Sequence, residues 1–111
     1  TGVYDESVMS IGSKESIIPE KFYVSDNYPN PFNPTTNFYI DVPEDGNLLV
    51  SVYDVNGRLV NELINTQVVA GRIHSRWSGK NSYGVMSPTG IYFLKVEAGA
   101  NYYVQKLALV K

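Results

Sequence analysis

Residues 37–65 read NFYIDVPEDGNLLVSVYDVNGRLVNELIN, and apolar and polar side chains alternate along much of this stretch. Phe38 and Ile40, for example, fall on one face of the chain, and the residues between them fall on the other. A period of two residues is typical of a strand that buries one face. The Asn56-Gly57 pair is a strong short-range signal for a hairpin turn. The stretch therefore predicts consecutive antiparallel strands.

Similar alternation recurs along the rest of the chain, between turn residues. The expected strands cover residues 21–25, 37–42, 48–52, 58–65, 72–78, 90–97 and 101–110. No segment of eleven residues keeps the 3.6-residue period of an amphipathic helix. Short strands at intervals of roughly 8–12 residues are typical of two packed antiparallel sheets. The sequence predicts an all-β fold, an immunoglobulin-like antiparallel β-sandwich of about seven strands.

The apolar faces of these strands predict the core. The expected buried residues are Phe38, Ile40, Val50, Val52, Ile73, Trp77, Tyr92, Leu94 and Val96. The single tryptophan shares a strand face with Ile73, so we expect it to pack in the core. The last run, residues 101–110, is largely apolar on both faces. A chain of 111 residues can bury one such core without disulfides.

The residue pattern of the chain changes near residue 20. Residues 1–19 read TGVYDESVMSIGSKESIIP and mix Gly, Ser and charged residues without a sustained period. We interpret residues 1–19 as a linker or the tail of an upstream domain. Residues 20–111 are expected to form a C-terminal β-sandwich domain.

Composition excludes several classes of function. The chain has no cysteine, so it has neither disulfides nor thiolate metal sites. Nine Lys and Arg against eleven Asp and Glu give a net charge of −2, and a nucleic-acid partner usually requires a basic surface. The apolar runs are far shorter than the ~20 residues of a transmembrane helix. We therefore expect no nucleic-acid partner and no transmembrane segment.

The polar residues suggest no enzyme. His74 is the only histidine and lies on the polar face of its strand between two arginines, where we expect it to face solvent. A catalytic imidazole requires a partner that orients it and a cleft for substrate. We expect no catalytic residue and no cofactor-binding residue. A calcium ion among Asp45, Asp54 and Asn81 remains an open alternative, because oxygen ligands suit that ion.

The chain holds nine tyrosines. Tyr23, Tyr39, Tyr53 and Tyr103 fall on the less apolar faces of their predicted strands. Exposed aromatic rings can bind sugars, but strands also favour aromatic residues for cross-strand packing. A carbohydrate-binding or structural spacer module on a secreted hydrolase is therefore the alternative function.

Five motifs occur in a characteristic order. They are NYPNPFNPTT at residues 27–36, VYDVNGRLV at 52–60, the stretch from Gly71 to Trp77-Ser78-Gly79, SPTGIYFLKVEAG at 87–99 and QKLALVK at 105–111. As a set they resemble the type A C-terminal sorting domain of the type IX secretion system, the Por secretion pathway. They are also similar to the related immunoglobulin-like domain of flagellar hook-capping proteins. The resemblance covers about residues 20–111.

The resemblance implies a function that composition does not reveal. It implies a non-catalytic C-terminal secretion signal that directs an exported cargo protein through the type IX outer-membrane translocon to the cell surface. The implied partners are that translocon, a sortase-like peptidase and an upstream cargo domain in the same chain. The implied location is secreted or at the cell surface, by way of the periplasm and the outer membrane. It implies no cofactor.

The resemblance also implies recognition residues in the last two strands. The matching positions are Gly90, Tyr92, Lys95, Lys106, Leu107, Val110 and Lys111. One departure is Ser78, which follows Trp77 where the family pattern often has Asp. In the proline-rich segment we expect Tyr28 and Phe32 to anchor the chain to the body of the domain.

Overall fold

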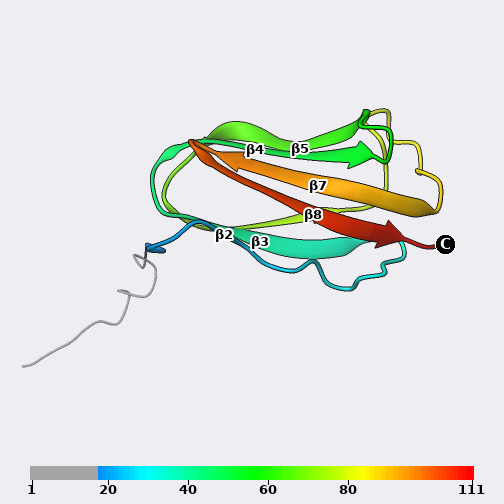
Figure 1. Cartoon of the computed structure of the whole chain (residues 1–111), viewed down its shortest axis with the longest axis horizontal. Coiled ribbons are helices and arrows are strands. Elements are labelled where there is room, and N and C mark those ends of the chain that lie inside the picture. The colour runs from blue at the N-terminus through cyan, green and yellow to red at the C-terminus, as the bar shows by residue number, and fades with distance from the viewer. Residues whose placement is uncertain (1–17) are drawn as a thin grey trace, which may run out of the picture.

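The computed structural model describes residues 18–111, so most of the predicted linker lies outside the described part of the chain. Seven strands and no helix make up this part (Figure 1). The strands are β2 (Tyr23–Val24), β3 (Thr36–Val42), β4 (Gly46–Asp54), β5 (Leu59–Val68), β6 (Gly71–Trp77), β7 (Gly90–Ala98) and β8 (Asn101–Leu109). The described residues therefore contain no helix long and apolar enough to cross a membrane.

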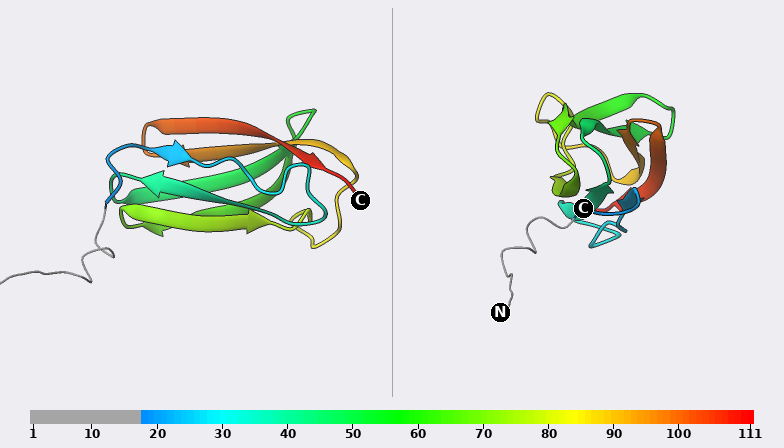
Figure 2. Two further views of the ribbon diagram at one scale, coloured as in Figure 1. Left: turned by 90° about the horizontal axis from the view of Figure 1, so that it is seen from below. Right: turned by 90° about the vertical axis from the view of Figure 1, so that its left-hand side faces the viewer.

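Two antiparallel sheets pack face to face. One has the strand order β2-β3-β6 and the other the order β5-β4-β7-β8 (Figure 1; Figure 2). The β7–β8 ladder runs without a register shift from Gly90 opposite Leu109 to Ala98 opposite Asn101. The fold is the antiparallel β-sandwich that the alternation predicted, and β8 lies at an edge of the larger sheet.

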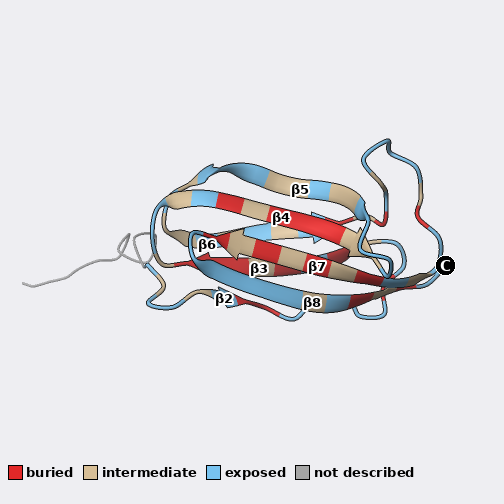
Figure 3. Cartoon of the chain, turned by 45° about the horizontal axis from the view of Figure 1, so that its top comes forward, coloured by how far each residue is buried: buried red, intermediate tan, exposed pale blue. Residues whose placement is uncertain are grey.

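The core residues come from strands of both sheets and from Phe32 in the proline-rich segment. Figure 3 marks the buried positions along the strands. Of the expected core residues, all except Ile73 are buried. Ile73 is only partly buried, although it packs against the core. It lies in β6, which has a neighbouring strand on one side only, so this side chain reaches the open margin of the sandwich.

Burial in the last strand is confined to its C-terminal end. Leu107 and Leu109 are almost fully buried, whereas residues 101–104 are exposed. Figure 3 shows the exposed half of β8 along the edge of the sheet. The apolar character of both faces therefore does not lead to burial at the start of this strand.

The two ends of the sandwich differ in the turns and chain ends that lie there. The first described residues enter at one end, and the C-terminus lies at the other (Figure 1). The turn between β4 and β5, the loop between β6 and β7, and the end of β8 share the end with the C-terminus (Figure 1). Most of the characteristic motifs therefore meet at this end.

Candidate functional site

Three aromatic side chains from three motifs form one cluster. The ring centroids of Phe32 and Trp77 are 5.6 Å apart, and those of Trp77 and Tyr92 are 5.1 Å apart. All three residues are buried. Aromatic pairs at these separations stabilise a core beyond the area that they bury. The motifs that identify the sequence therefore build the core at the C-terminal end of the sandwich.

The proline-rich segment pairs with the end of β8. The Phe32 amide donates to the Ala108 carbonyl at 2.9 Å, and the Val110 amide donates to the Phe32 carbonyl at 2.9 Å. Phe32 is 1% exposed, which confirms that it anchors the segment. The expectation for Tyr28 is wrong, because its side chain is 79% exposed. Its backbone instead exchanges two hydrogen bonds with Asn37.

Buried amides link this segment to both sheets. The Asn27 amide donates to Gln105 Oε1 at 2.7 Å, and Gln105 Nε2 donates to the Ser25 carbonyl at 3.0 Å. The Asn27 side chain is buried and donates to Thr36 Oγ1 at 3.0 Å. A buried polar group is costly unless it has partners. These bonds fix the path of the proline-rich segment alongside β8.

Tyr92 and Leu107 belong to the core. They lie opposite each other in the β7–β8 ladder and are 5% and 0% exposed. The Tyr92 hydroxyl donates to the Pro88 carbonyl at 2.6 Å. Burial raises the pKa of this phenol above its usual value, although a hydrogen bond with Ser87 opposes the shift. Both side chains therefore position the last two strands and are not accessible to a receptor.

Two glycines of the motifs differ in the space around them. Gly79 has a φ of +78°, and a Cβ there would lie 2.7 Å from Met86 Cε and 3.1 Å from the Pro34 carbonyl oxygen. This position therefore requires glycine for space as well as for conformation. At Gly90, the first residue of β7, a Cβ would meet no atom within 4 Å.

Lys95 lies on the outer face of the larger sheet between two tyrosines. Its Nζ is 5.6 Å from the ring centroid of Tyr53 and 5.5 Å from that of Tyr102. The same Nζ lies 3.6 Å from Glu97 Oε2. These distances suit cation–π attraction at a surface. The sequence analysis missed this arrangement, although the alternation of strand faces places Lys95 and Tyr53 on the same side.

Lys106 lies on the same outer face as Lys95. The ladder pairs Lys95 with Val104 and Phe93 with Lys106, so the two lysines are diagonal neighbours on adjacent strands. Lys106 is exposed. Beyond the end of β8, Val110 is 41% exposed and Lys111 is exposed.

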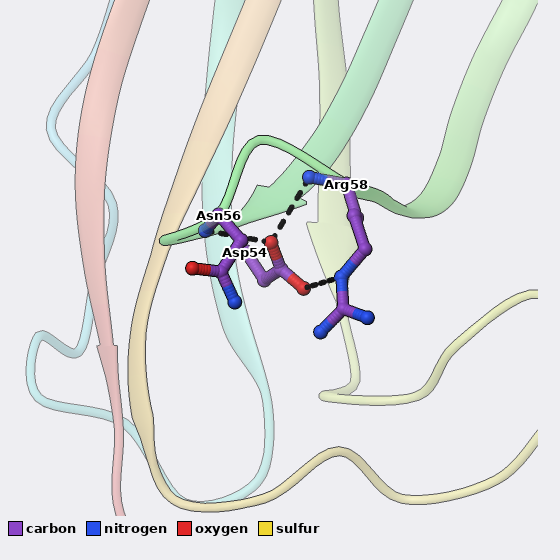
Figure 4. Close-up of polar contacts among 3 residues, drawn as sticks. All are labelled: Asp54, Asn56 and Arg58. Atoms are coloured by element: carbon purple, nitrogen blue, oxygen red, sulfur yellow. Dashed lines mark hydrogen bonds and ion pairs between the residues drawn. The ribbon is translucent and has the colours of Figure 1, made fainter.

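The Asp54 side chain holds the turn between β4 and β5 (Figure 4). One carboxylate oxygen accepts from the Asn56 amide at 2.9 Å and from the Arg58 amide at 3.0 Å. The other accepts from Arg58 Nε at 3.1 Å. These donors, the Arg58 amide foremost, hold the pKa of Asp54 below its usual value. Gly57 has a φ of +81°, which confirms the predicted turn.

The three candidate calcium ligands do not come together. Asp45 precedes β4 and Asp54 ends it, so the two carboxylates are roughly 30 Å apart along the strand. Asp45 Oδ1 accepts from the Ala70 amide at 2.8 Å. Asn81 Oδ1 accepts from two amides of its own loop. Residues 18–111 contain no group of three or more acidic, His or Cys side chains arranged for a metal ion.

The four candidate sugar-binding tyrosines are divided between the two sheets. Tyr23 and Tyr39 pack 6.0 Å apart on the smaller sheet, where the Arg72 guanidinium lies 3.8 Å from the Tyr39 ring centroid. Tyr53 lies on the outer face of the larger sheet. The expectation for Tyr103 is wrong, because it pairs with the buried Val96 and so shares the face that packs on the core. His74 is exposed, as expected, and its ring is 6.0 Å from that of Tyr39. The four tyrosines therefore form no common platform.

Comparison with known families identifies this arrangement. A family model described as the secretion system C-terminal sorting domain matches residues 26–110. The chain belongs to this family. The sorting domain is thus a secretion signal, which favours this function over the carbohydrate-binding or spacer alternative.

Solved structures share the fold of the sorting domain. Dimeric latent PorU from Porphyromonas gingivalis matches with a TM-score of 0.60 and 24% identity, over 81% of this chain and 9% of that chain. FlgD from P. aeruginosa matches with a TM-score of 0.52 and 32% identity, over 67% of this chain and 59% of that chain. PorZ, a surface component of the type-IX secretion system of Porphyromonas gingivalis, matches with a TM-score of 0.53 and 20% identity, over 83% of this chain and 12% of that chain.

The sorting domain therefore spans less than two thirds of each of these three chains. No curated protein matches the chain. The relation to FlgD agrees with the resemblance to flagellar hook-capping proteins.

The seven expected recognition residues do not form one site in the sorting domain. Tyr92 and Leu107 lie in the core. Lys95 and Lys106 share the outer face of the larger sheet, and the last two residues lie at the end of the sandwich. Side chains that a partner can contact directly are therefore those of the lysines and Val110.

Proposed function

We propose that this domain is the export address of a cargo protein and is read by the type IX outer-membrane translocon. The match of the sorting-domain family over residues 26–110 is the observation that carries the proposal. The shared fold with PorZ, a surface component of the type-IX secretion system, supports it. The domain directs its cargo by way of the periplasm and the outer membrane to the cell surface.

The partners follow from this role. Residues 20–111 form the sorting domain, and residues 1–19 join it to a cargo domain upstream. A sortase-like peptidase acts on the exported protein near that junction. The first described residues enter the sandwich at the end opposite the C-terminus (Figure 1). This arrangement supports a cargo junction at one end of the domain and a recognition surface near the other.

The domain itself is proposed to be non-catalytic. The polar side chains considered for chemistry bind backbone instead: Asp54 and Asn81 accept amide protons in their own loops, and Asp45 accepts one from Ala70. Groups that serve as turn acceptors are not free to move a proton or to hold a substrate.

Recognition rests on the exposed side chains of the last hairpin. Among the expected residues, Lys95, Lys106, Val110 and Lys111 present side chains to solvent, whereas Tyr92 and Leu107 place the strands. Lysines in this position provide positive charge beside apolar strand surface. A receptor with acidic side chains fits such a surface.

A reporter fusion tests the proposal. The full chain is placed behind a reporter with an export signal, in a host that has the type IX pathway. The test variant carries Lys106→Ala with Lys111→Ala, and the matched control carries Lys21→Ala with Lys80→Ala. All four lysines are exposed, so each variant should keep its unfolding free energy within about 0.5 kcal/mol.

The wild type and the control are expected at the cell surface, and the test variant in the periplasm. A wild-type fusion that never reaches the surface would show that the domain is not an export address. Equal delivery of all variants would show that the terminal lysines are not read. Deletion of residues 108–111 is a folding control, because it removes Leu109 from the core and both backbone bonds to Phe32.

A further inference from the structure

One half of the β8 edge is unpaired. At the closed half, the backbone groups of Ala108 point outward and bond to the proline-rich segment. The ladder with β7 has no register shift, so alternate residues turn their amides and carbonyls to the same side. Tyr102, Val104 and Lys106 therefore point their backbone groups outward as well. Within residues 18–111 these groups have no hydrogen-bond partner.

This open edge lacks the usual protection. Natural edge strands carry charges, prolines or bulges that prevent pairing with another chain. Residues 101–105 contain no charged residue, and Tyr102 and Val104 are 61% and 43% exposed. The edge strand β6, in contrast, carries Arg72 and Arg76 with exposed side chains. The edge strand β5 has two register irregularities against β4.

The domain shows that this edge can pair with an added chain. Phe32 forms a parallel bridge with Leu109. The bridge does not extend into a longer ladder, because Pro34, the next residue along the segment to face β8, lacks an amide donor. On the other side, the Ala108 amide bonds to the side chain of Asn30 and not to its backbone. Towards the open half, residues 26–31 line an open pocket of about 610 Å³ together with Gln105 and Lys106. There the segment bonds to the Gln105 side chain and to no backbone group of residues 102–106.

The charges beside the open edge indicate which kind of strand fits it. Lys106 is exposed at the boundary of the uncharged stretch, and no ion pair to it occurs among the described residues. The charge of Lys95 is already offset by Glu97. In strand addition, the backbone provides affinity and alternate side chains provide specificity. The complementary strand is apolar opposite Tyr102 and Val104 and acidic opposite Lys106.

We propose that residues 102–106 are a strand acceptor for an extended segment of a protein of the export apparatus. That segment has apolar residues opposite Tyr102 and Val104 and an acidic residue opposite Lys106. Only the assignment of the partner to the export apparatus rests on the proposed function. The strand acceptor itself is a property of the edge.

A tethered strand tests the acceptor without a natural partner. The full chain is extended beyond Lys111 by about twelve Gly and Ser residues, with a reach of roughly 19 Å, and then by the sequence Glu-Thr-Val-Thr-Val-Thr. Running antiparallel to β8, this strand places its Glu opposite Lys106 and its Val residues opposite Val104 and Tyr102. The tether keeps the local concentration high, so weak pairing is measurable. The control tether has Pro in place of both Val residues.

Amide hydrogen exchange at Tyr102, Val104 and Lys106 is the readout. We expect exchange at least tenfold slower with the Val tether than with the Pro tether, at the same protein concentration. Equal rates with the two tethers would overturn the strand acceptor. Slowing that depends on concentration in the untethered chain would assign the edge to a second copy of the domain and would overturn the proposed partner.

Variants at Val104 test the partner in the reporter fusion. Val104→Pro removes an amide that has no partner in the free domain and leaves the β7 ladder intact. Val104→Lys adds a charge to the edge without changing the backbone, and Val104→Thr is the matched control. We expect the control at the surface and the other two variants in the periplasm.

Normal delivery of Val104→Lys with an unchanged unfolding midpoint would show that the export apparatus does not use this edge. The same conclusion would follow from normal delivery of Val104→Pro. If the wild-type fusion is itself not delivered, the proposed function fails, and the tethered strand still decides whether the edge is an acceptor.

Discussion

The indole ring of Trp77 meets the phenol ring of Tyr92 edge to face, with 5.1 Å between their centroids. Phe32 packs against the same indole from the proline-rich segment, at 5.6 Å. Two buried ring contacts thus join three motifs that are separate in the sequence. Much of the motif set of the sorting-domain family therefore consists of residues that hold the last hairpin in the fold.

Removal of the Trp77 ring should strongly destabilise the domain. Trp77→Ala is expected to lower the free energy of unfolding by about 3–5 kcal/mol, because it leaves a cavity between Phe32 and Tyr92. Chemical denaturation monitored by circular dichroism measures this loss. Tyr83→Ala is the matched control, since Tyr83 is 88% exposed and should change stability by about 0.5 kcal/mol or less. A loss below about 1 kcal/mol for Trp77→Ala would contradict the core assignment.

The Tyr92 hydroxyl should make a smaller contribution. Tyr92→Phe keeps the ring but leaves the Pro88 carbonyl without its donor, and we expect a loss of about 0.5–1.5 kcal/mol. Burial raises the folded pKa of this phenol, so its contribution is complete below the unfolded value of 10.0 and is lost as pH rises through the folded value. The difference in unfolding free energy between the two proteins should therefore be constant from pH 8 to 10.0 and shrink above that pH. A difference that stays constant above pH 10.0 would contradict the raised pKa.

Two glycines with nearly the same φ allow the effect of backbone strain to be separated from the effect of limited space. Gly57→Ala and Gly79→Ala both place a side chain at a positive φ, near +81° and +78°. At Gly57 the new methyl meets nothing, so we expect a loss of about 1–2 kcal/mol from conformation alone. At Gly79 it also clashes with Met86 and the Pro34 carbonyl, so the loss should be larger. Equal losses in thermal unfolding would show that the loop relaxes without cost.

Acid should weaken the turn between β4 and β5. The pKa of Asp54 is lower in the folded state than its unfolded value of 3.8. Its charged form therefore stabilises the fold above that value, and this contribution is lost as pH falls through the lower folded pKa. Asp54→Asn should be less stable than the wild type at pH 7, and the difference should shrink as pH falls below 3.8. A difference that persists unchanged in acid would indicate a role for Asp54 other than its charge.

Chelation should leave the domain unchanged. The oxygens of Asp45, Asp54 and Asn81 accept backbone amide protons in three separate turns. We expect the same thermal unfolding midpoint with and without EDTA. A decrease of several degrees in EDTA would reveal a cation that stabilises the fold.

The sequence by itself determined the strands and much of the core. Alternation of period two depends on neighbouring residues, and it correctly placed Phe38, Ile40 and Val50 inside. The turn at Asn56-Gly57 is equally local, because a positive φ favours glycine wherever the chain reverses. The order of the motifs also identified the family, as the match over residues 26–110 confirms.

Only the tertiary structure decided which apolar residues are covered. Tyr28 and Phe32 look alike in the sequence, yet Phe32 faces β8 and Tyr28 faces solvent. Ile73 is partly exposed because its strand lies at a sheet edge. The candidate recognition residues were likewise divided between core and surface by strand pairing. Burial depends on what lies across the sandwich, and strand order and sheet packing set this through contacts between residues far apart in the chain.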